Sequence, residues 1–238
     1  MIPIGMDPLQ CLAFALSQPE WQLTLGLAGL VGAVSYAFYR VSSSAEERLR
    51  GLYGLSLGAS LGVGFLLSTV ACVLFLTACN TNFMTAAVLA LPLTGLLTLG
   101  VAYVYGDRLA ALAYGAKPLN NPFLTALVRR LSASSGVPLP HLYYFDSGEV
   151  RVVSTAGRSN AIFLSMGALE SLSQQELQVV MTHELAHVRH RDPLKKLAIR
   201  LTLAPSFLLQ RVIQEHEQRA DLASGNTAVL TRAAAKFA

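Results

Sequence analysis

The chain has 238 residues, of which 53% are hydrophobic and 13% are charged, and its mean hydropathy is +0.48. Soluble domains carry about 25% charged residues, so this composition excludes an ordinary soluble protein and predicts that part of the chain lies in a bilayer. The net charge is +4, but no basic stripe is interleaved with aromatic residues, so we expect no nucleic-acid partner.

The two halves of the chain differ in charge. Residues 1–115 have a net charge of −1 and residues 116–238 a net charge of +5. Most of the apolar residues lie in the first half and most of the titratable groups in the second. We therefore predict a membrane anchor over residues 1–115 and a polar domain over residues 116–238. The positive balance of that domain suits a position against anionic membrane lipid.

Three uncharged stretches of the anchor reach the roughly 20 residues that span a bilayer. They cover residues 21–39, 52–79 and 83–105. Three such runs would need a very large core in a soluble protein, so we predict three transmembrane helices. Lys and Arg follow the first and third stretches, whereas residues 80–82 carry no charge. Because positive residues stay on the cytoplasmic side, we expect the N-terminus outside and the polar domain in the cytoplasm.

Small residues in these stretches recur every four positions. Gly54, Gly58 and Gly62 form one stripe, and Gly29 with Ala33 offers the same spacing in the first stretch. Such stripes allow two helices to approach closely. We expect them to pack the three helices together, with a homo-oligomer as the alternative.

The three cysteines of the chain are Cys11, Cys72 and Cys79. They form no CxxC pair and lie in or near apolar stretches. Thiols in such surroundings are usually buried and reduced, so we expect neither a disulfide framework nor metal ligands among them.

The polar domain alternates short strand patterns with helical ones. Apolar residues have helical spacing over residues 123–131, and β-like runs cover residues 142–145, 150–154 and 161–165. The fold class predicted for the whole chain is therefore α+β. Three N-terminal transmembrane helices would precede a mainly helical domain with a small β-sheet.

Two longer helices are expected to follow these strands. Ser173 and Glu176 have the spacing of a capping box, which predicts a helix that runs to about residue 190 before Pro193. A second helical stretch begins at residue 194, bends near Pro205 and continues through residue 221. Its apolar part is too short for a fourth span.

The first of these helices contains an HExxH motif. His183 and His187 are four residues apart, about 40° around a helix, so both imidazoles can bind one metal ion. Glu184 is adjacent and can reach a metal-bound water as general base. Zinc is the metal that these ligand types favour, and one ion per chain is expected.

A catalytic zinc site usually has three protein ligands and a water. Glu217 and Asp221 lie four residues apart on the second helix, so Glu217 can bind the metal while Asp221 accepts a hydrogen bond from a ligand imidazole. Glu215 and His216 remain alternatives for the third ligand.

The sequence HELAHVRHRD followed by EQRAD resembles the HtpX-like and CAAX-prenyl-protease-type membrane metallopeptidases, which are gluzincins. The resemblance covers about residues 121–225. It implies that His183, His187 and Glu217 hold zinc, that Glu184 is the base, and that Asp221 orients a ligand. It also implies that one strand binds substrate backbone by strand addition. The residues of that strand are Ala161, Ile162, Phe163, Leu164 and Ser165.

Two features depart from the family pattern. Many members have a pair of membrane helices between HExxH and the glutamate, whereas here only residues 188–216 intervene. The family often has Asn-Ala-Phe before its glycine turn, where this chain has Val152-Val153-Ser154. Both leave the substrate and the subfamily open.

Five other polar residues have expected roles outside the metal ligands and the base. Asp192 is expected to cap or pair locally, and His190 to lie at a solvated helix end. Arg158 is either a turn residue or a substrate contact. Arg219 and Arg232 are weak options for stabilising an oxyanion.

The function expected from these features is that of a membrane-bound zinc metalloendopeptidase. It would cut membrane-proximal polypeptides in quality control or precursor processing. The alternatives are a sensor-transducer whose peptidase domain cleaves a regulator, and a non-enzymatic membrane module with a structural zinc site. Glu184 argues against the last, because a structural zinc site has no use for an unbound carboxylate beside the metal.

Overall fold

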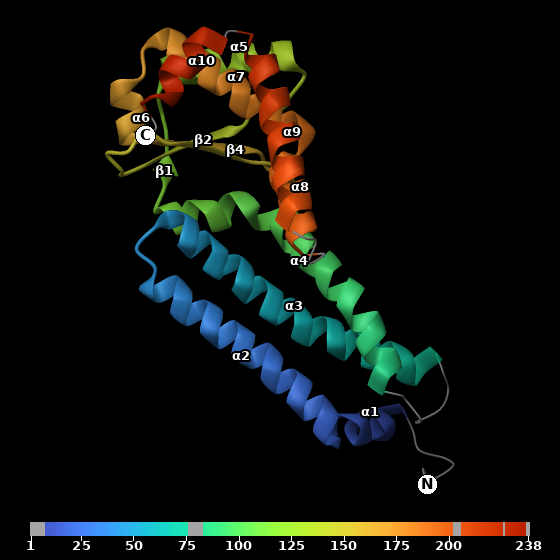
Figure 1. Ribbon diagram of the computed structural model, residues 1–238. Helices are drawn as coiled ribbons and strands as arrows, with labels where there is room; N and C mark the ends of the chain where they lie inside the picture. The colour runs from blue at the N-terminus through green and yellow to red at the C-terminus, as the bar shows by residue number, and fades with distance from the viewer. Residues whose placement is uncertain (1–7, 76–82, 202–205, 226, 237–238) are drawn as a thin grey trace. The chain divides into compact units, whose positions relative to one another are not determined.

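The protein is described here by a computed structural model in which residues 8–75, 83–201, 206–225 and 227–236 are placed (Figure 1). It divides into two compact units, Met1–Val101 and Ala102–Ala238, which are described separately. The division falls within one long helix, α4 (Phe83–Tyr114). The predicted boundary between residues 115 and 116 lies just after that helix ends.

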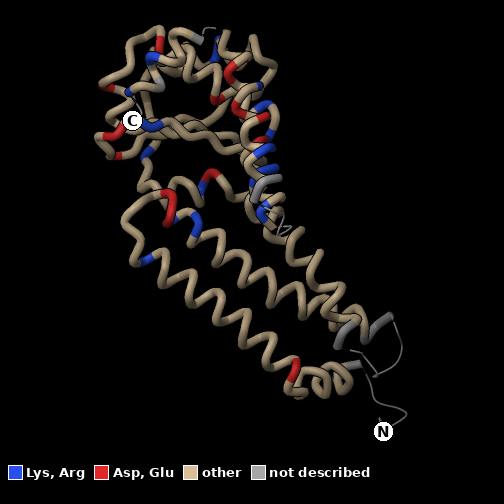
Figure 2. The backbone as a smooth tube through the Cα atoms, viewed as in Figure 1, with Lys and Arg blue, Asp and Glu red and all other residues tan. Residues whose placement is uncertain are grey.

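The first unit contains the predicted membrane helices. A short helix, α1 (Pro8–Ser17), precedes α2 (Pro19–Val41), α3 (Ala45–Phe75) and the first part of α4. Three helical segments are long and apolar enough to cross a bilayer, and they cover Pro19–Val41, Ala45–Cys72 and Thr85–Tyr114. Figure 2 shows long uncharged lengths of these helices, with charged residues mainly near their ends. Three apolar helices of spanning length are therefore present where three spans were predicted, although residues 76–79 of the second stretch lie outside the described residues.

The glycine stripe of α3 packs against α2. A Cβ added at Gly58 would lie 2.9 Å from the backbone nitrogen of Gly32, and one at Gly54 would lie 2.5 Å from Ser35 Oγ. The facing surface of α2 is formed by Ala28, Gly32 and Ser35. The predicted pair, Gly29 and Ala33, does not form this contact, and a Cβ at Gly29 would meet nothing within 4 Å. One residue turns a helix by about 100°, so a stripe displaced by one position faces away.

The cysteines differ from one another in state. Cys72 is a free thiol buried in the helical core beside Phe65 and Trp21, as expected. Cys11 is disulfide-bonded, so the expectation of reduced thiols is wrong for this residue. Cys79 lies outside the described residues.

The second unit is built around a four-stranded sheet with the order β1-β2-β4-β3. β1 (Lys117–Pro118) pairs antiparallel with β2 (His141–Phe145). β2 is parallel to β4 (Ala161–Ser165), which pairs antiparallel with β3 (Val152–Thr155). All five residues of β4 are buried, so β4 forms the centre of the sheet.

Helices cover both faces of this sheet. The side chains of Ile162 and Leu164 join the main core with α5 (Pro122–Ser135) and α7 (Gln174–His190). On the opposite face, Tyr114 at the end of α4 stacks on Phe163 with ring centroids 5.9 Å apart. Alternate residues of a strand point to opposite faces, so β4 binds the two helical layers together.

The remaining helices are α6 (Met166–Ser171), α8 (Asp192–Leu201), α9 (Ser206–Ser224) and α10 (Thr227–Ala234). The predicted α+β class, with a small sheet in a mainly helical domain, is confirmed. β2, β3 and β4 lie within two residues of the predicted strands. β1 and α6 were not predicted, because two residues and six residues give no clear periodic pattern.

Candidate active site

The predicted capping box fixes the start of α7. The Ser173 side chain accepts a hydrogen bond from the Glu176 backbone N–H, and the Glu176 carboxylate accepts one from the Ser173 backbone. Lys236 also contacts this carboxylate at 2.8 Å. The side-chain bonds from Lys236 and Ser173 lower the pKa of Glu176 to about 2. At the other end, Arg191 has a φ of 53° and closes the helix in the left-handed conformation.

Packing of α7 directs its two histidines to one side. Met181, Leu185 and Val188 are buried in the core that α7 shares with the sheet. His183 and His187 project from another side of the helix, and their Nε2 atoms lie 3.1 Å apart. Two imidazoles on one helical face therefore present the same ring nitrogen to the same point.

The third group comes from α9. Glu217 Oε2 lies 3.4 Å from the Nε2 atom of His183 and 3.4 Å from that of His187. The three side chains form a group that could hold a metal ion. Glu215 instead contacts Arg211 on its own helix, and buried His216 faces Asp192 at 3.5 Å. Of the three predicted options for the third ligand, only Glu217 faces the histidines.

The distances between these atoms suit zinc. Tetrahedral zinc with bonds of about 2.0–2.1 Å to nitrogen and oxygen separates its ligand atoms by about 3.3 Å. The observed separations are 3.1, 3.4 and 3.4 Å. Three atoms with lone pairs at this spacing repel one another unless a proton or a cation lies between them. The donor set and its spacing therefore fit a single zinc ion.

Each ligand side chain has a further polar partner. His187 Nδ1 hydrogen-bonds Asp192 Oδ2 at 3.0 Å, and Asp192 is 1% exposed. His183 Nδ1 lies 3.1 Å from Asp221 Oδ1, without the alignment of a full hydrogen bond. Carboxylates at Nδ1 favour the tautomer whose Nε2 lone pair is free for a metal. Asp221 thus lies beside the imidazole of His183, and Asp192 pairs with the imidazole of His187.

Glu217 is also fixed from its other side. Its Oε1 atom accepts a hydrogen bond from Lys196 Nζ at 2.9 Å. The hydrogen bonds from His183 and His187 hold the pKa of the Glu217 carboxyl well below its usual range. Burial alone would lower the pKa of His187, but Glu217, Glu184 and Asp192 together raise it. The neighbouring groups therefore hold Glu217 as a carboxylate.

The glutamate of the motif lies between the helix and the sheet. The Ser154 side chain of β3 lies close enough to Glu184 to favour its ionised carboxylate. Burial raises the pKa of the Glu184 carboxyl, while His187, Ser154 and His183 oppose that rise. No role was predicted for Ser154. Its position in the strand before the glycine turn was the available signal.

The sheet corrects one predicted site. The strand Ala161–Ser165 was expected to bind substrate backbone, but β4 is hydrogen-bonded to β2 on one side and to β3 on the other. A strand paired on both sides cannot accept a third strand. Among the described strands, β3 is the edge of the sheet next to α7, and it carries Ser154. The prediction of β4 as the substrate strand is therefore wrong.

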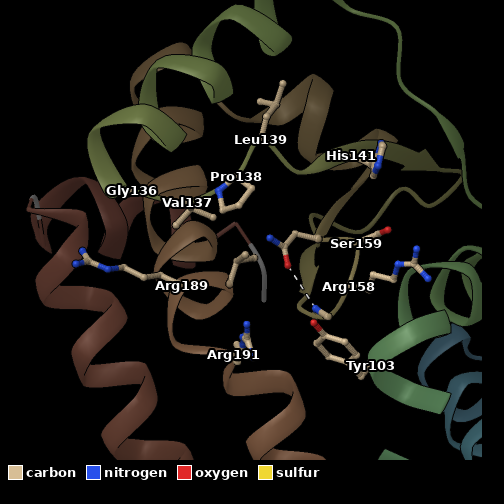
Figure 3. A pocket seen from close by; sticks show the side chains of 13 residues that line it. Tyr103, Gly136, Val137, Pro138, Leu139, His141, Arg158, Ser159, Arg189 and Arg191 are labelled. Atoms are coloured by element: carbon tan, nitrogen blue, oxygen red, sulfur yellow. Dashed lines mark hydrogen bonds between the residues drawn. The ribbon is translucent and has the colours of Figure 1, made fainter. Parts of the chain in front are cut away.

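Arg158 lies away from the group formed by His183, His187 and Glu217. It lines a cavity of about 420 Å³ at the C-terminal end of α7, and none of the predicted site residues lines that cavity (Figure 3). Its backbone N–H bonds the carbonyl of Tyr103 at 2.8 Å. Figure 3 shows Arg158 and Arg189 directing their guanidinium groups to opposite sides. The positive charges of Arg158 and Arg189 therefore do not converge on one point of the cavity.

Arg219 and Arg232 are both exposed, and no contact among the described residues joins either to the cluster. The group that would stabilise an oxyanion therefore stays unassigned.

An HExxH helix with a glutamate from a later helix at its histidines is the arrangement of a gluzincin-type metallopeptidase. Residues 118–237 match the sequence profile of Peptidase family M48. The chain belongs to this family.

Curated relatives support the same relationship. The chain is 38% identical over 109 residues to a protease HtpX homolog from Acidiphilium cryptum, covering 44% of this chain and 38% of that protein. It is 37% identical over 132 residues to a homolog from Acaryochloris marina, covering 52% and 44%. Protease HtpX from Legionella pneumophila is 38% identical over 114 residues, covering 46% and 40%. The matched part thus spans less than half the length of these relatives.

The chain also aligns with a solved structure. The crystal structure of S. mikatae Ste24p aligns with a TM-score of 0.47 and 15% identity, covering 94% of this chain and 75% of that one.

Proposed function

We propose that this protein is a zinc-dependent metalloendopeptidase that cuts polypeptides near the membrane. The observation that carries the proposal is the convergence of His183, His187 and Glu217, with the far side of each side chain in contact with a further polar group. Bound zinc would supply a Lewis acid that lowers the pKa of a water and polarises the scissile carbonyl.

The chain's own residues would carry the proton transfers. The Glu184 carboxylate would take a proton from the attacking water and deliver it to the nitrogen of the leaving amine. The burial that raises the pKa of Glu184 brings it closer to neutrality, where one carboxyl group can both accept and donate. The Ser154 hydroxyl would hold the carboxylate in place between these steps.

Substrate binding is proposed for the free side of β3. An extended peptide could add there as an antiparallel strand, with its backbone held by main-chain hydrogen bonds. Strand addition binds a peptide mainly through its backbone and not through its side chains, so it suits substrates with varied sequences. Misfolded membrane proteins and precursors that need one cut are both such substrates.

We further propose that the N-terminus faces outward and the peptidase unit faces the cytoplasm. The distribution of Lys and Arg around the three spans supports this topology. The disulfide of Cys11 supports it independently, because disulfides persist in oxidising compartments. A reporter that fluoresces only in the cytoplasm, fused after residue 238, is expected to be fluorescent. Loss of its signal at equal protein level would contradict the topology.

The catalytic proposal is tested with the full chain in detergent. Wild type is expected to bind about one zinc ion and to cleave casein. Glu184→Gln is expected to keep zinc and lose cleavage, because it removes the base and none of the ligands. Glu217→Ala is expected to lose both. A Glu184→Gln variant that cleaves like wild type would refute the assigned mechanism.

A further inference from the structure

The two oxygens of Glu217 face different partners. Oε2 faces the histidines, and Oε1 accepts a hydrogen bond from Lys196 Nζ at 2.9 Å. The Glu217 side chain is 44% exposed, whereas that of Lys196 is 25% exposed. The lysine is therefore the more buried member of the pair, and it occupies the oxygen that is turned away from the metal site.

Glu217 needs such a partner more than the histidines do. Both histidines belong to α7, where core packing fixes the helix and carboxylates lie at each Nδ1. Glu217 comes from α9, and a half-exposed glutamate has several rotamers that would direct it into solvent. A charge-assisted hydrogen bond selects one of these rotamers.

α8 supplies partners to two ligands. Asp192, in its first turn, bonds His187, and Lys196, four residues later, bonds Glu217. Residues four apart lie on the same side of a helix. The short connection between α7 and α9 thus presents one anion to an imidazole and one cation to a carboxylate.

We propose that Lys196 is a positioning residue for the zinc site, which holds Glu217 in the rotamer that directs Oε2 toward His183 and His187. The inference rests on the proposed function, since it assigns a role toward the zinc ligands. Lys196 acts through Glu217 and touches neither substrate nor metal.

The direction of the change in zinc affinity distinguishes a positioning role of Lys196 from a purely electrostatic one. A cation beside a divalent metal repels it, so a lysine that acts only through its charge would weaken zinc binding, and its removal would strengthen binding. A lysine that positions Glu217 has the opposite effect, because its removal frees the carboxylate. Loss of a group that hydrogen-bonds a metal ligand typically weakens metal affinity by roughly 10- to 100-fold.

The experiment measures zinc affinity of the full chain in detergent, by competition with a chromophoric chelator and without any cleavage assay. Lys196→Met is expected to bind zinc about 10- to 100-fold more weakly than wild type. Lys196→Arg should restore most of this loss, because guanidinium can also bond the carboxylate. Lys195→Met is the matched control. Lys195 is adjacent on α8 and carries the same charge, but it contacts Asp192 at 3.7 Å rather than Glu217.

Each outcome bears on the proposal. Wild-type or tighter zinc binding in Lys196→Met would overturn it, and so would an equal loss in Lys195→Met. The thermal midpoint of each metal-free variant separates a positioning effect from misfolding, and Lys196→Arg provides a folded comparison. Absence of zinc binding in the wild type would instead refute the proposed function, and the inference with it.

Discussion

Replacing Asp192 with asparagine tests whether the buried carboxylate sets the tautomer of His187. Asn has nearly the same volume, so the substitution leaves packing intact and changes only charge and hydrogen bonding. Asp192 is 1% exposed and lies 3.0 Å from His187 Nδ1. An asparagine amide can turn its NH₂ group toward Nδ1. That would favour the tautomer with a proton on Nε2, the atom proposed to bind zinc.

The size of the effect follows from the bond that is lost. Hydrogen bonds to charged groups contribute about 1.5–3 kcal/mol, against about 1 kcal/mol for neutral pairs. At about 1.4 kcal/mol per factor of ten, removal of the charge and of the correct tautomer should weaken zinc binding roughly 10- to 100-fold. Asp192 also faces His216, and removal of one member of a buried pair destabilises the fold, so the metal-free thermal midpoint should fall as well.

Zinc affinity and the midpoint would be measured on the same detergent-purified protein, with Asp146→Asn as an exposed control. The reasoning is refuted if Asp192→Asn keeps wild-type affinity. A lower midpoint with unchanged affinity would make Asp192 a purely structural residue that caps α8.

Three further predictions address other parts of the chain. Glu176→Gln should lower the thermal midpoint at pH 7. Because the folded pKa of about 2 lies below the ordinary value of 4.5, this difference should shrink as the pH falls from 4.5 toward 2. Gly58→Leu should destabilise the packed helices by about 1–3 kcal/mol, seen as a lower midpoint, whereas Gly29→Leu should have little effect. Ser154→Ala removes a hydroxyl group that favours ionised Glu184, so the acidic limb of the pH–rate profile should move to higher pH. An acidic limb at the wild-type pH would show that Ser154 does not affect the ionisation of Glu184.

Local signals were sufficient for much of this structure. Helix α7 was predicted to end at about residue 190 and ends at His190, and its start was marked by the capping box. The three spans were predicted by length and hydropathy alone. HExxH fixes the relation of its three residues within a single helix, so no knowledge of tertiary structure was needed.

The remaining features depend on contacts between distant segments. Which strand forms the edge of the sheet is decided by pairing order, which the short sequences of β3 and β4 do not specify. The continuous apolar run of β4 was nevertheless a signal for a strand buried on both faces. Asp192 and Lys196 acquire their roles only when α8 lies beside α7 and α9, which no spacing rule foresees. The helix stripe was misread because Ala28 and Gly32 differ from the predicted pair by a single position.

The left-handed conformation of Arg191 between α7 and α8 limits where residues can be inserted into this part of the chain. Asp192 reaches back to His187 over only five residues, through one tight reversal. An inserted residue would rotate Asp192 and Lys196 by about 100° and direct both away from the ligands. Insertions between His187 and Lys196 should therefore be excluded, whereas an insertion between α8 and α9 would leave the Asp192 contact in place. That is the segment in which a longer relative could accommodate extra helices without disturbing its metal centre.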